Sequence, residues 1–324
     1  FKQKTAYEIG VRLVGSEMCI RDRYIRQSGD DPFALCVSYL EPHPPHTGPL
    51  DDYYDPQRLP LGPGFMRRPP GDAPLIVRLM AAFYMASDNY GLDLQTESGW
   101  RALMARYWGN VSLVDRSVAK IFKALEESGK ADDTIVVFTS DNGTTHLKQE
   151  VDYDFFNSVG KLRGLKGSLY EGGVRVPLIV RWPGKIKAGS SSDFVTGFED
   201  WIPTLLELAG HKGEGDEELD GISIAPTLLG KKQPEREFLY REFSGYGGQQ
   251  ALWMGKWKGI RQRLLRDKKK PVKEKLRIQL YDLENDISES KDVATKNPEV
   301  VARIRKLLEQ EHTPSKLFPI KPLD

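Results

Sequence analysis

Two oxygen-bearing side chains stand side by side in the segment T-I-V-V-F-T-S-D-N-G, residues 134–143. Asp141 offers a carboxylate and Asn142 a neutral amide oxygen, a pair that suits a hard cation such as Ca²⁺, with Mg²⁺ as second choice. The β-branched run before them lacks polar alternation, which predicts a strand covered on both faces. Open α/β sheets bind ligands at the carboxyl ends of strands, so this turn is a candidate metal site. D-N-G is also a common turn tripeptide, and alone it favours an ordinary turn.

The next segment supplies positive charge. Lys166 lies between Gly164 and Gly167, where the backbone can approach an anion closely. Its ammonium is a compact point charge suited to a sulfate or phosphate oxygen. Further positive charge nearby in sequence comes from Lys161, Arg163, Arg175 and Arg181. The segment matches neither the P-loop pattern nor G-x-G-x-x-G, and a glycine-rich surface loop with solvated lysines is the alternative.

These motifs together resemble a known family. T-S-D-N-G, then K-G-S-L-Y-E-G-G-V-R-V-P, then a run that ends W-P-G, closely resemble the second signature region of the sulfatases. The resemblance extends over roughly Tyr24 to Leu308. It implies that Asp141 and Asn142 are Ca²⁺ ligands. It also implies that Lys166 contacts the sulfate ester through its bridging or peripheral oxygens.

Two histidines follow the run Asp31–Leu40, whose pattern predicts a strand with Cys36 as a small buried side chain. Two isolated histidines in a proline-stiffened loop favour a polar surface loop, and an H-x-x-H zinc site would lack a third ligand. The sulfatases, by resemblance, carry a histidine in a P-H-T-x-P setting, which residues 45–49 match. His46 is then the candidate sulfate ligand and general acid toward the leaving oxygen, with His43 as second choice.

A third histidine, His146, follows the metal turn by three residues. It is a candidate substrate-binding side chain, and a solvated loop histidine is the equal alternative.

The elements that would position these residues follow from apolar periodicity. Helices are predicted over 74–90 and 98–128, and the second leads into the 134–143 strand as an α/β crossover. Residues 195–209 predict a short strand and a helix. The segment from residue 238, with a last helix over 300–310, resembles the small C-terminal subdomain of the sulfatases, an antiparallel sheet with a packed helix.

The implied fold class is α/β, an alkaline-phosphatase-like sulfatase fold with a partial central sheet flanked by helices and a small C-terminal antiparallel-sheet subdomain. We expect a partial catalytic domain over residues 24–235 and the C-terminal subdomain over 236–324. Residues 1–23 resemble translated adapter read-through and are expected to be a non-native leader. The basic run 266–275 favours a solvated hairpin loop, with docking of an anionic polysaccharide as the alternative.

Composition places few further bounds on function. With 39% hydrophobic residues, 29% charged residues and a net charge of +1, the chain fits a globular protein without a general affinity for nucleic acid. No apolar run approaches the length of a membrane span. Two cysteines exclude a disulfide framework and leave the compartment open; a periplasmic or secreted location follows only from the family resemblance.

The nucleophile that the resemblance implies is a formylglycine made in C/S-x-P-x-R. Cys19 opens C-I-R-D-R, which lacks the proline, so it is a decoy. The first metal strand, which by resemblance supplies paired aspartates, is also missing, as are the lysine and histidine that follow the nucleophile in the family. We therefore expect the C-terminal portion of a sulfatase, inactive alone, with the formylglycine in a missing N-terminal part. The intact enzyme would cleave sulfate esters of carbohydrate or aryl alcohols.

Two alternatives remain. One is a phosphodiesterase or phosphonate monoester hydrolase of the same superfold. The other is a non-catalytic protein that binds sulfated glycans. The expected partner of the sulfatase is a sulfated small molecule or glycan.

Overall fold

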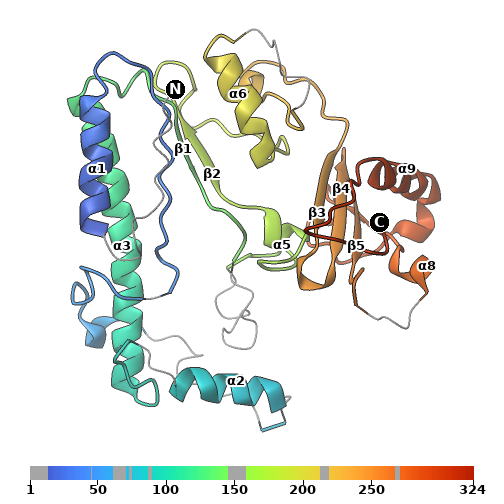
Figure 1. Ribbon diagram of the computed structural model, residues 1–324, viewed down its shortest axis with the longest axis horizontal. Helices are drawn as coiled ribbons and strands as arrows, with labels where there is room; N and C mark the ends of the chain where they lie inside the picture. Colours follow the sequence, from blue (N-terminus) through green and yellow to red (C-terminus); the bar gives the residue numbers. More distant parts are fainter. Residues whose placement is uncertain are drawn as a thin grey trace. The chain divides into compact units, whose positions relative to one another are not determined.

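The computed structural model describes residues 14–44, 46–60, 71–72, 75–86, 90–144, 158–211, 219–266 and 271–324. The chain divides into a first unit, Phe1–Thr134 with Gln149–Phe155, and a second unit, Ile135–Lys148 with Phe156–Asp324. Figure 1 labels most of their helices and strands, and each unit is described by itself. The predicted boundaries after residues 23 and 235 stay predictions. No helix in the described ranges combines the length and apolar character that a membrane crossing requires.

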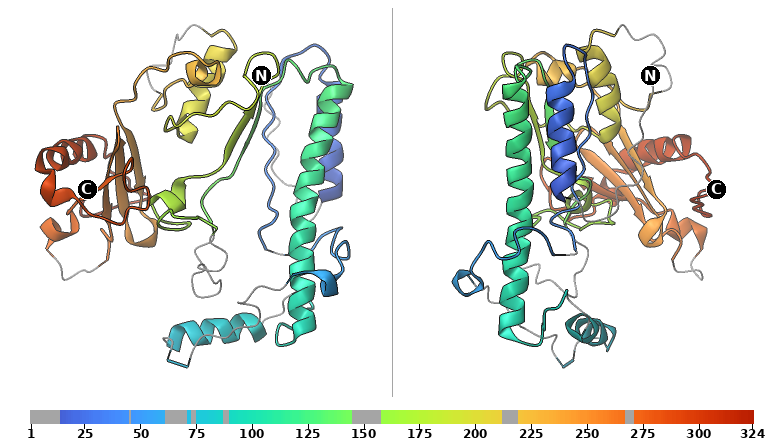
Figure 2. Two further views of the ribbon diagram at one scale, coloured as in Figure 1. Left: turned by 180° about the vertical axis from the view of Figure 1, so that it is seen from behind. Right: turned by 60° about the vertical axis from the view of Figure 1, so that its left-hand side comes forward.

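Two helices packed side by side dominate the first unit (Figures 1 and 2): α1 (Val14–Gln27) and α3 (Glu97–Glu127). Thr96 caps α3 by accepting a hydrogen bond from the Gly99 amide, as an N-cap threonine does. The helix predicted over 98–128 is confirmed. α2 (Leu75–Ala86) confirms the other predicted helix, and a 3₁₀ turn, η1, spans Pro56–Arg58.

The described end of the predicted leader packs against the chain that follows. α1 runs through residue 23, and the Arg21 side chain is buried. Its guanidinium donates to the Tyr39 hydroxyl at 2.8 Å. At Arg21, therefore, the segment expected to be foreign contributes a contact to this unit.

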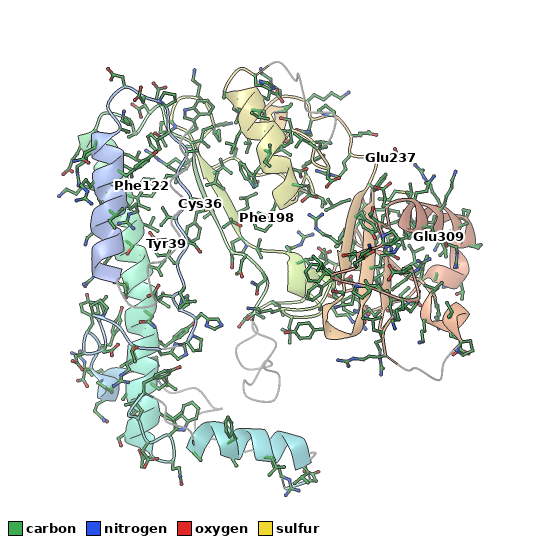
Figure 3. The ribbon with its side chains drawn as sticks, viewed as in Figure 1. Cys36, Tyr39, Phe122, Phe198, Glu237 and Glu309 are labelled. Carbon is green, nitrogen blue, oxygen red and sulfur yellow. The ribbon has the colours of Figure 1, made fainter. Side chains whose placement is uncertain are left out.

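The strand predicted over Asp31–Leu40 is wrong. Residues 32–40 have no regular secondary structure, and Cys36, predicted to be buried, is exposed. Figure 3 labels Cys36 and Tyr39 on this irregular stretch. A strand requires a hydrogen-bonded neighbour, and no described segment pairs with these residues. An apolar pattern alone cannot supply that neighbour.

In the second unit, β1 (Val136–Thr139) pairs antiparallel with β2 (Leu178–Arg181) as a two-stranded ribbon. Both strands were predicted as apolar runs, but the expectation that β1 is covered on both faces is wrong within the described residues. Phe138 is 46% exposed and Ile179 is 62% exposed. The reason is that each strand has only the other as a described neighbour, so no layer covers the ribbon. The predicted α/β crossover is likewise not formed by described strands.

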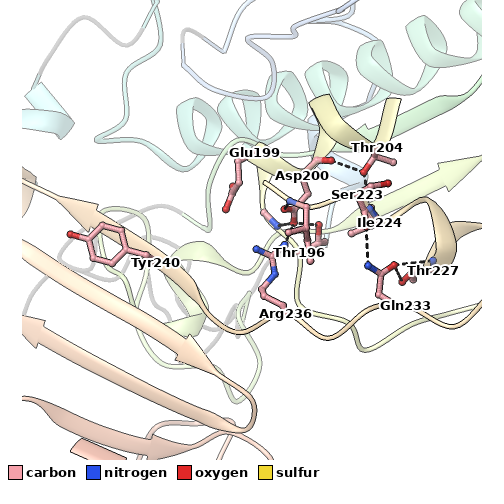
Figure 4. A network of polar contacts seen from close by, with 12 residues as sticks. Thr196, Glu199, Asp200, Thr204, Ser223, Ile224, Thr227, Gln233, Arg236 and Tyr240 are labelled. Atoms are coloured by element: carbon pink, nitrogen blue, oxygen red, sulfur yellow. Dashed lines mark hydrogen bonds and ion pairs between the residues drawn. The ribbon is translucent and has the colours of Figure 1, made fainter. Parts of the chain in front are cut away.

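The segment after β2 is organised by one buried carboxylate. The strand predicted near residue 195 is absent from the described residues; a 3₁₀ turn, η2 (Phe198–Asp200), leads directly into α6 (Trp201–Leu208). Asp200 is fully buried and accepts hydrogen bonds from Thr196, from Arg236 and from two main-chain amides (Figure 4). These bonds hold the extended chain without a strand partner. A short helix, α7 (Ala225–Leu228), follows.

The rest of the second unit is an antiparallel sheet in the order β3-β4-β5-β6. The strands are β3 (Leu239–Phe243), β4 (Gln249–Met254), β5 (Trp257–Gln262) and β6 (Gln279–Asp282). The connecting and following turns and helices are η4 (Gly245–Gly247), α8 (Val272–Lys275), η5 (Ala294–Lys296) and α9 (Pro298–Gln310). The predicted antiparallel sheet with a packed last helix is confirmed.

The two faces of this sheet pack against different partners. Side chains alternate along a strand, so Leu252 and Leu280 face α9, where Ile304 and Leu308 are fully buried with them. Gly259 lets the helix approach, because a Cβ there would lie 2.6 Å from Ile304 Cγ2.

On the opposite face, the sheet side chains Trp253, Ile260 and Tyr281 form a second core with Leu169 and Tyr170. These two residues come from the glycine-rich segment that also carries Lys166. That segment continues into a short helix, α5 (Glu171–Val174). The sheet is therefore the support on which the predicted anion-binding loop rests.

Candidate functional site

The turn after β1 and the loop that carries Lys166 are joined through their main chains. The Gly143 amide donates to the Gly173 carbonyl at 3.0 Å, and the Lys166 amide donates to the Thr144 carbonyl at 2.7 Å. Asp141 is exposed and Asn142 is partly exposed at this junction. Two motifs that the sequence presents more than twenty residues apart thus form one local structure.

Close contact between main chains explains the glycines of this region. A Cβ on Gly143 would lie 2.2 Å from the Gly172 carbonyl oxygen, and one on Gly172 would lie 2.3 Å from that of Gly164. Gly164 and Gly167 have φ angles of +83° and +84°, which glycine adopts without steric cost. The spacing K-G-x-x-x-E-G-G therefore reflects backbone packing.

The charges that could meet a ligand here are unpaired within the described part of the chain. No described residue accepts a hydrogen bond or forms an ion pair with the Lys166 ammonium, and the same holds for the Asp141 carboxylate. By contrast, Arg163 donates to the Glu289 carbonyl and the Tyr281 hydroxyl. Arg175 pairs with Glu171 at 2.9 Å. These two arginines are bound to the framework, whereas the Lys166 ammonium has no partner among the described residues.

Beneath the loop lies an ion cluster that sequence reasoning missed. Lys258 is fully buried, with its Nζ 2.9 Å from Glu171 Oε1 and 2.8 Å from Glu289 Oε1. The Trp253 indole donates to the same Glu171 oxygen at 2.8 Å. The Glu171 amide in turn donates to Glu289 Oε2 at 2.7 Å. The cluster ties the start of α5 to strands β4 and β5.

The two carboxyl groups of this cluster differ in proton affinity. Burial acts to raise the pKa of Glu171, but Lys258, the Trp253 indole and Arg175 outweigh it and hold that pKa below its ordinary value. Burial prevails at Glu289 and raises its pKa, despite the same ammonium. Glu171 is therefore the anionic partner of Lys258 at neutral pH.

Only part of a metal site is present in the described residues. Asp141 and Asn142 offer oxygen donors of the kind Ca²⁺ prefers, at a strand end where no described group pairs with the carboxylate. No cluster of three or more His, Cys, Asp or Glu side chains that could hold a metal occurs in those ranges. Since Ca²⁺ takes about six to eight oxygens, this pair fits as one portion of a coordination sphere.

His46 lies in the first unit, on a loop held by α3. Gly109 of the helix admits the loop, because a Cβ there would lie 2.4 Å from the Leu50 carbonyl oxygen. The His46 ring meets Tyr107 edge to face, with centroids 5.5 Å apart. Its Nδ1 is buried and has no hydrogen-bond partner in the described ranges.

Burial, with a smaller contribution from His43, lowers the pKa of His46. Without a bound ligand, the His46 ring is therefore mainly neutral at neutral pH. His46 and Lys166 belong to different units, so their meeting in one pocket stays a prediction. His146 lies outside the described residues. No third ligand for an H-x-x-H zinc site occurs in the described ranges.

Comparison with known protein families gives two overlapping matches. The model described as Sulfatase matches residues 21–211, which is more than half of the chain. The model described as N-sulphoglucosamine sulphohydrolase, C-terminal, matches residues 165–314. The second match begins just before Lys166 and so includes both the loop and the sheet beneath it.

Individual proteins match over part of their length. The steryl-sulfatase of Mus musculus is 38% identical over 149 residues, which are 45% of this chain and 24% of that protein. The N-acetylgalactosamine-6-O-sulfatase of Bacteroides thetaiotaomicron is 33% identical over 220 residues, 63% of this chain and 42% of that protein. The chain thus spans about a quarter to two fifths of these curated relatives.

Among solved structures, Ps i-CgsB in complex with k-i-k-neocarrahexaose superposes with a TM-score of 0.63 at 25% identity, over 94% of this chain and 55% of that one. The predicted fold class, α/β with a small antiparallel C-terminal sheet, is confirmed by this likeness.

Proposed function

The chain belongs to the sulfatase family, and from that membership we propose that the intact protein hydrolyses a sulfate ester of a carbohydrate or aryl alcohol. The observation that carries this proposal is the junction of the Asp141–Asn142 turn with the Lys166 loop. It brings an oxygen donor pair for a hard cation and an ammonium that no described residue pairs with into one local structure. The named relatives that act on sulfate esters support the same reaction.

Each residue has a role that its surroundings allow. The Lys166 ammonium binds a peripheral or bridging sulfate oxygen and stabilises the negative charge that develops on the leaving oxygen. A Ca²⁺ ion held in part by Asp141 and Asn142 would polarise the sulfate group. The buried cluster of Glu171, Lys258 and Glu289 holds the loop on the sheet. The loop that carries Lys166 is therefore already in place before substrate binds.

His46 protonates the leaving oxygen in this proposal. Its pKa is lowered by burial, so the free enzyme holds a neutral ring. A bound sulfate dianion or monoester would favour the charged ring and raise its pKa toward the value a general acid needs. His146 is proposed as an additional substrate-binding side chain. Since neither cysteine lies in a C/S-x-P-x-R motif, we propose that these 324 residues by themselves do not turn over substrate.

The experiment that tests the function uses the full-length protein and three substrates. 4-Nitrophenyl sulfate should be hydrolysed with a kcat/KM at least about a hundredfold above that for phenylphosphonate 4-nitrophenyl ester and bis-4-nitrophenyl phosphate. A preference for either phosphorus ester would support the phosphonate or phosphodiester alternative instead. Binding of sulfated glycan without hydrolysis of any ester would support the non-catalytic alternative.

A further inference from the structure

An exposed aromatic side chain lies directly against the Lys166 loop. Tyr246 occupies η4, the turn between β3 and β4. A Cβ on Gly167 would lie 2.6–2.8 Å from the Tyr246 ring carbons Cε2, Cζ and Cδ2, so the ring packs on the Gly167 main chain. Gln249, just after the turn, donates to the Gly167 carbonyl at 2.7 Å and accepts from the Leu169 amide at 3.1 Å. The turn and the loop are therefore fixed to each other next to Lys166.

A second ring extends this surface. Phe243 ends β3, and its ring centroid lies 5.9 Å from that of Tyr246 at an interplanar angle of 35°. Tyr246 remains 49% exposed and Phe243 38% exposed. Large aromatic side chains usually bury most of their surface, so a paired exposure beside a candidate site requires an explanation.

The turn holds Tyr246 in a conformation that costs free energy. Its φ of 52° and ψ of 25° lie in the left-handed region, which is disfavoured for residues other than glycine. The surrounding ladder enforces it, because the Leu265 and Leu264 amides donate to the Gly247 and Gly248 carbonyls. Strain that is enforced by its surroundings concentrates at functional sites. Here it presents the ring in a fixed orientation.

Two basic residues belong to the segments that contact this turn. Lys166 directly precedes Gly167, whose main chain packs against the Tyr246 ring. The exposed Arg266 lays its stem over Gly247, the residue after Tyr246, where a Cβ would lie 2.7–2.9 Å from the Arg266 Nε, Cδ and Cγ atoms. A ligand that covers this surface must therefore combine an apolar face with negative charge at its rim.

We propose that Phe243 and Tyr246 form a platform for the sugar ring whose sulfate ester is held at Lys166. The apolar C–H face of a pyranose stacks on an open aromatic surface while its hydroxyl groups stay in water. A second sulfate on the saccharide would pair with Arg266. A fully apolar alcohol such as a sterol would instead need an enclosed apolar pocket. The platform rests on the proposed function, since it selects the alcohol portion of the same substrate.

The test compares two probes on the full-length protein: inorganic sulfate, which has no ring, and N-acetylgalactosamine 6-sulfate. Tyr246→Gly removes the ring and relieves the left-handed strain, so loss of folding does not confuse the result. We expect it to weaken saccharide binding about five- to tenfold and to leave inorganic sulfate binding unchanged. Tyr246→Phe should retain saccharide binding. Phe318→Ala, which removes an exposed aromatic ring from the C-terminal segment, is the matched control and should change neither.

Equal weakening of both probes, or of neither, by Tyr246→Gly would overturn the platform. Hydrolysis of 4-nitrophenyl sulfate by a wild-type protein that does not bind the saccharide would also overturn it and leave the sulfatase proposal standing. Ring-dependent saccharide binding without hydrolysis of any sulfate ester would sustain the platform and refute the proposed catalysis.

Discussion

Lys258 is fully buried between the carboxyl groups of Glu171 and Glu289, and its removal would leave both without their shared partner. Breaking a buried ion pair destabilises the fold because the remaining charge is desolvated and has no opposite charge beside it. We expect Lys258→Met to lower the free energy of unfolding by about 3–5 kcal/mol, measured by urea denaturation. Lys256→Met is the control, because that lysine pairs with Asp282 at an exposed position and should have little effect. Equal effects of the two substitutions would contradict the role given to the cluster.

Asp200 predicts a dependence of stability on pH. Burial acts to raise its pKa, but Arg236 and main-chain donors outweigh it and hold the pKa below the ordinary 3.8. A carboxyl with a depressed folded-state pKa stabilises the protein above its unfolded-state pKa. That contribution is lost as pH falls through the folded-state value.

Asp200→Asn should therefore lower the free energy of unfolding at pH 7 by about 2 kcal/mol or more. It should also reduce the loss of stability as pH falls below the ordinary carboxyl pKa value of 3.8. The exposed Asp193→Asn serves as control and should leave the pH profile unchanged. If the free energy of unfolding of Asp200→Asn depended on pH as it does in the wild type, the role given to Asp200 would be refuted.

At the scale of elements, the site depends on glycine contacts between the β1 turn and the Lys166 loop. Gly143→Ala would place a methyl group 2.2 Å from the Gly172 carbonyl oxygen, which neither main chain can avoid without moving. We expect at least about a tenfold loss of inorganic sulfate affinity, because the Thr144–Lys166 hydrogen bond would be displaced.

The control for that substitution is Gly71→Ala, where a Cβ would meet nothing within 4 Å. Amide hydrogen exchange of the β4–β5 pair should stay slow in both variants, since those strands pair independently of the turn. Unaltered sulfate affinity in Gly143→Ala would show that the junction does not position Lys166.

Elements with strong local patterns could be predicted from the sequence, and those that need distant partners could not. Apolar periodicity predicts α3 and α9, and alternation of aromatic and polar residues predicts the C-terminal strands. The run Asp31–Leu40 has strand composition, but no described strand pairs with it.

The same limit applies to the site. Asp141, Asn142 and Lys166 are visible because their motif is contiguous. Lys258 and Glu289 are not, because they meet Glu171 only through the folding of the sheet, and Glu289 sits at a left-handed φ of 50° that composition does not predict. Tyr246 was missed for the same reason.

At the scale of the whole molecule, the proposed reaction requires His46 to reach the ester held at Lys166. His46→Ala in the full-length protein should reduce kcat/KM for N-acetylgalactosamine 6-sulfate at least about tenfold more than for 4-nitrophenyl sulfate. The activated aryl ester needs less protonation of its leaving oxygen. His43→Ala, which removes the neighbouring exposed histidine, is the control. Equal losses on the two esters in His46→Ala would assign that side chain to binding alone.

We propose that the junction of Asp141 and Lys166 forms the sulfate-ester site of the intact enzyme. The most direct measurement is the kcat/KM of the full-length protein for 4-nitrophenyl sulfate in the wild type, Asp141→Ala and Lys166→Ala, with and without exhaustive chelation. We expect wild-type turnover that chelation abolishes and added Ca²⁺ restores. We also expect losses of at least about a hundredfold in both variants, with reduced bound calcium only in Asp141→Ala. Wild-type turnover in either variant, or undiminished activity after chelation, would contradict the claim.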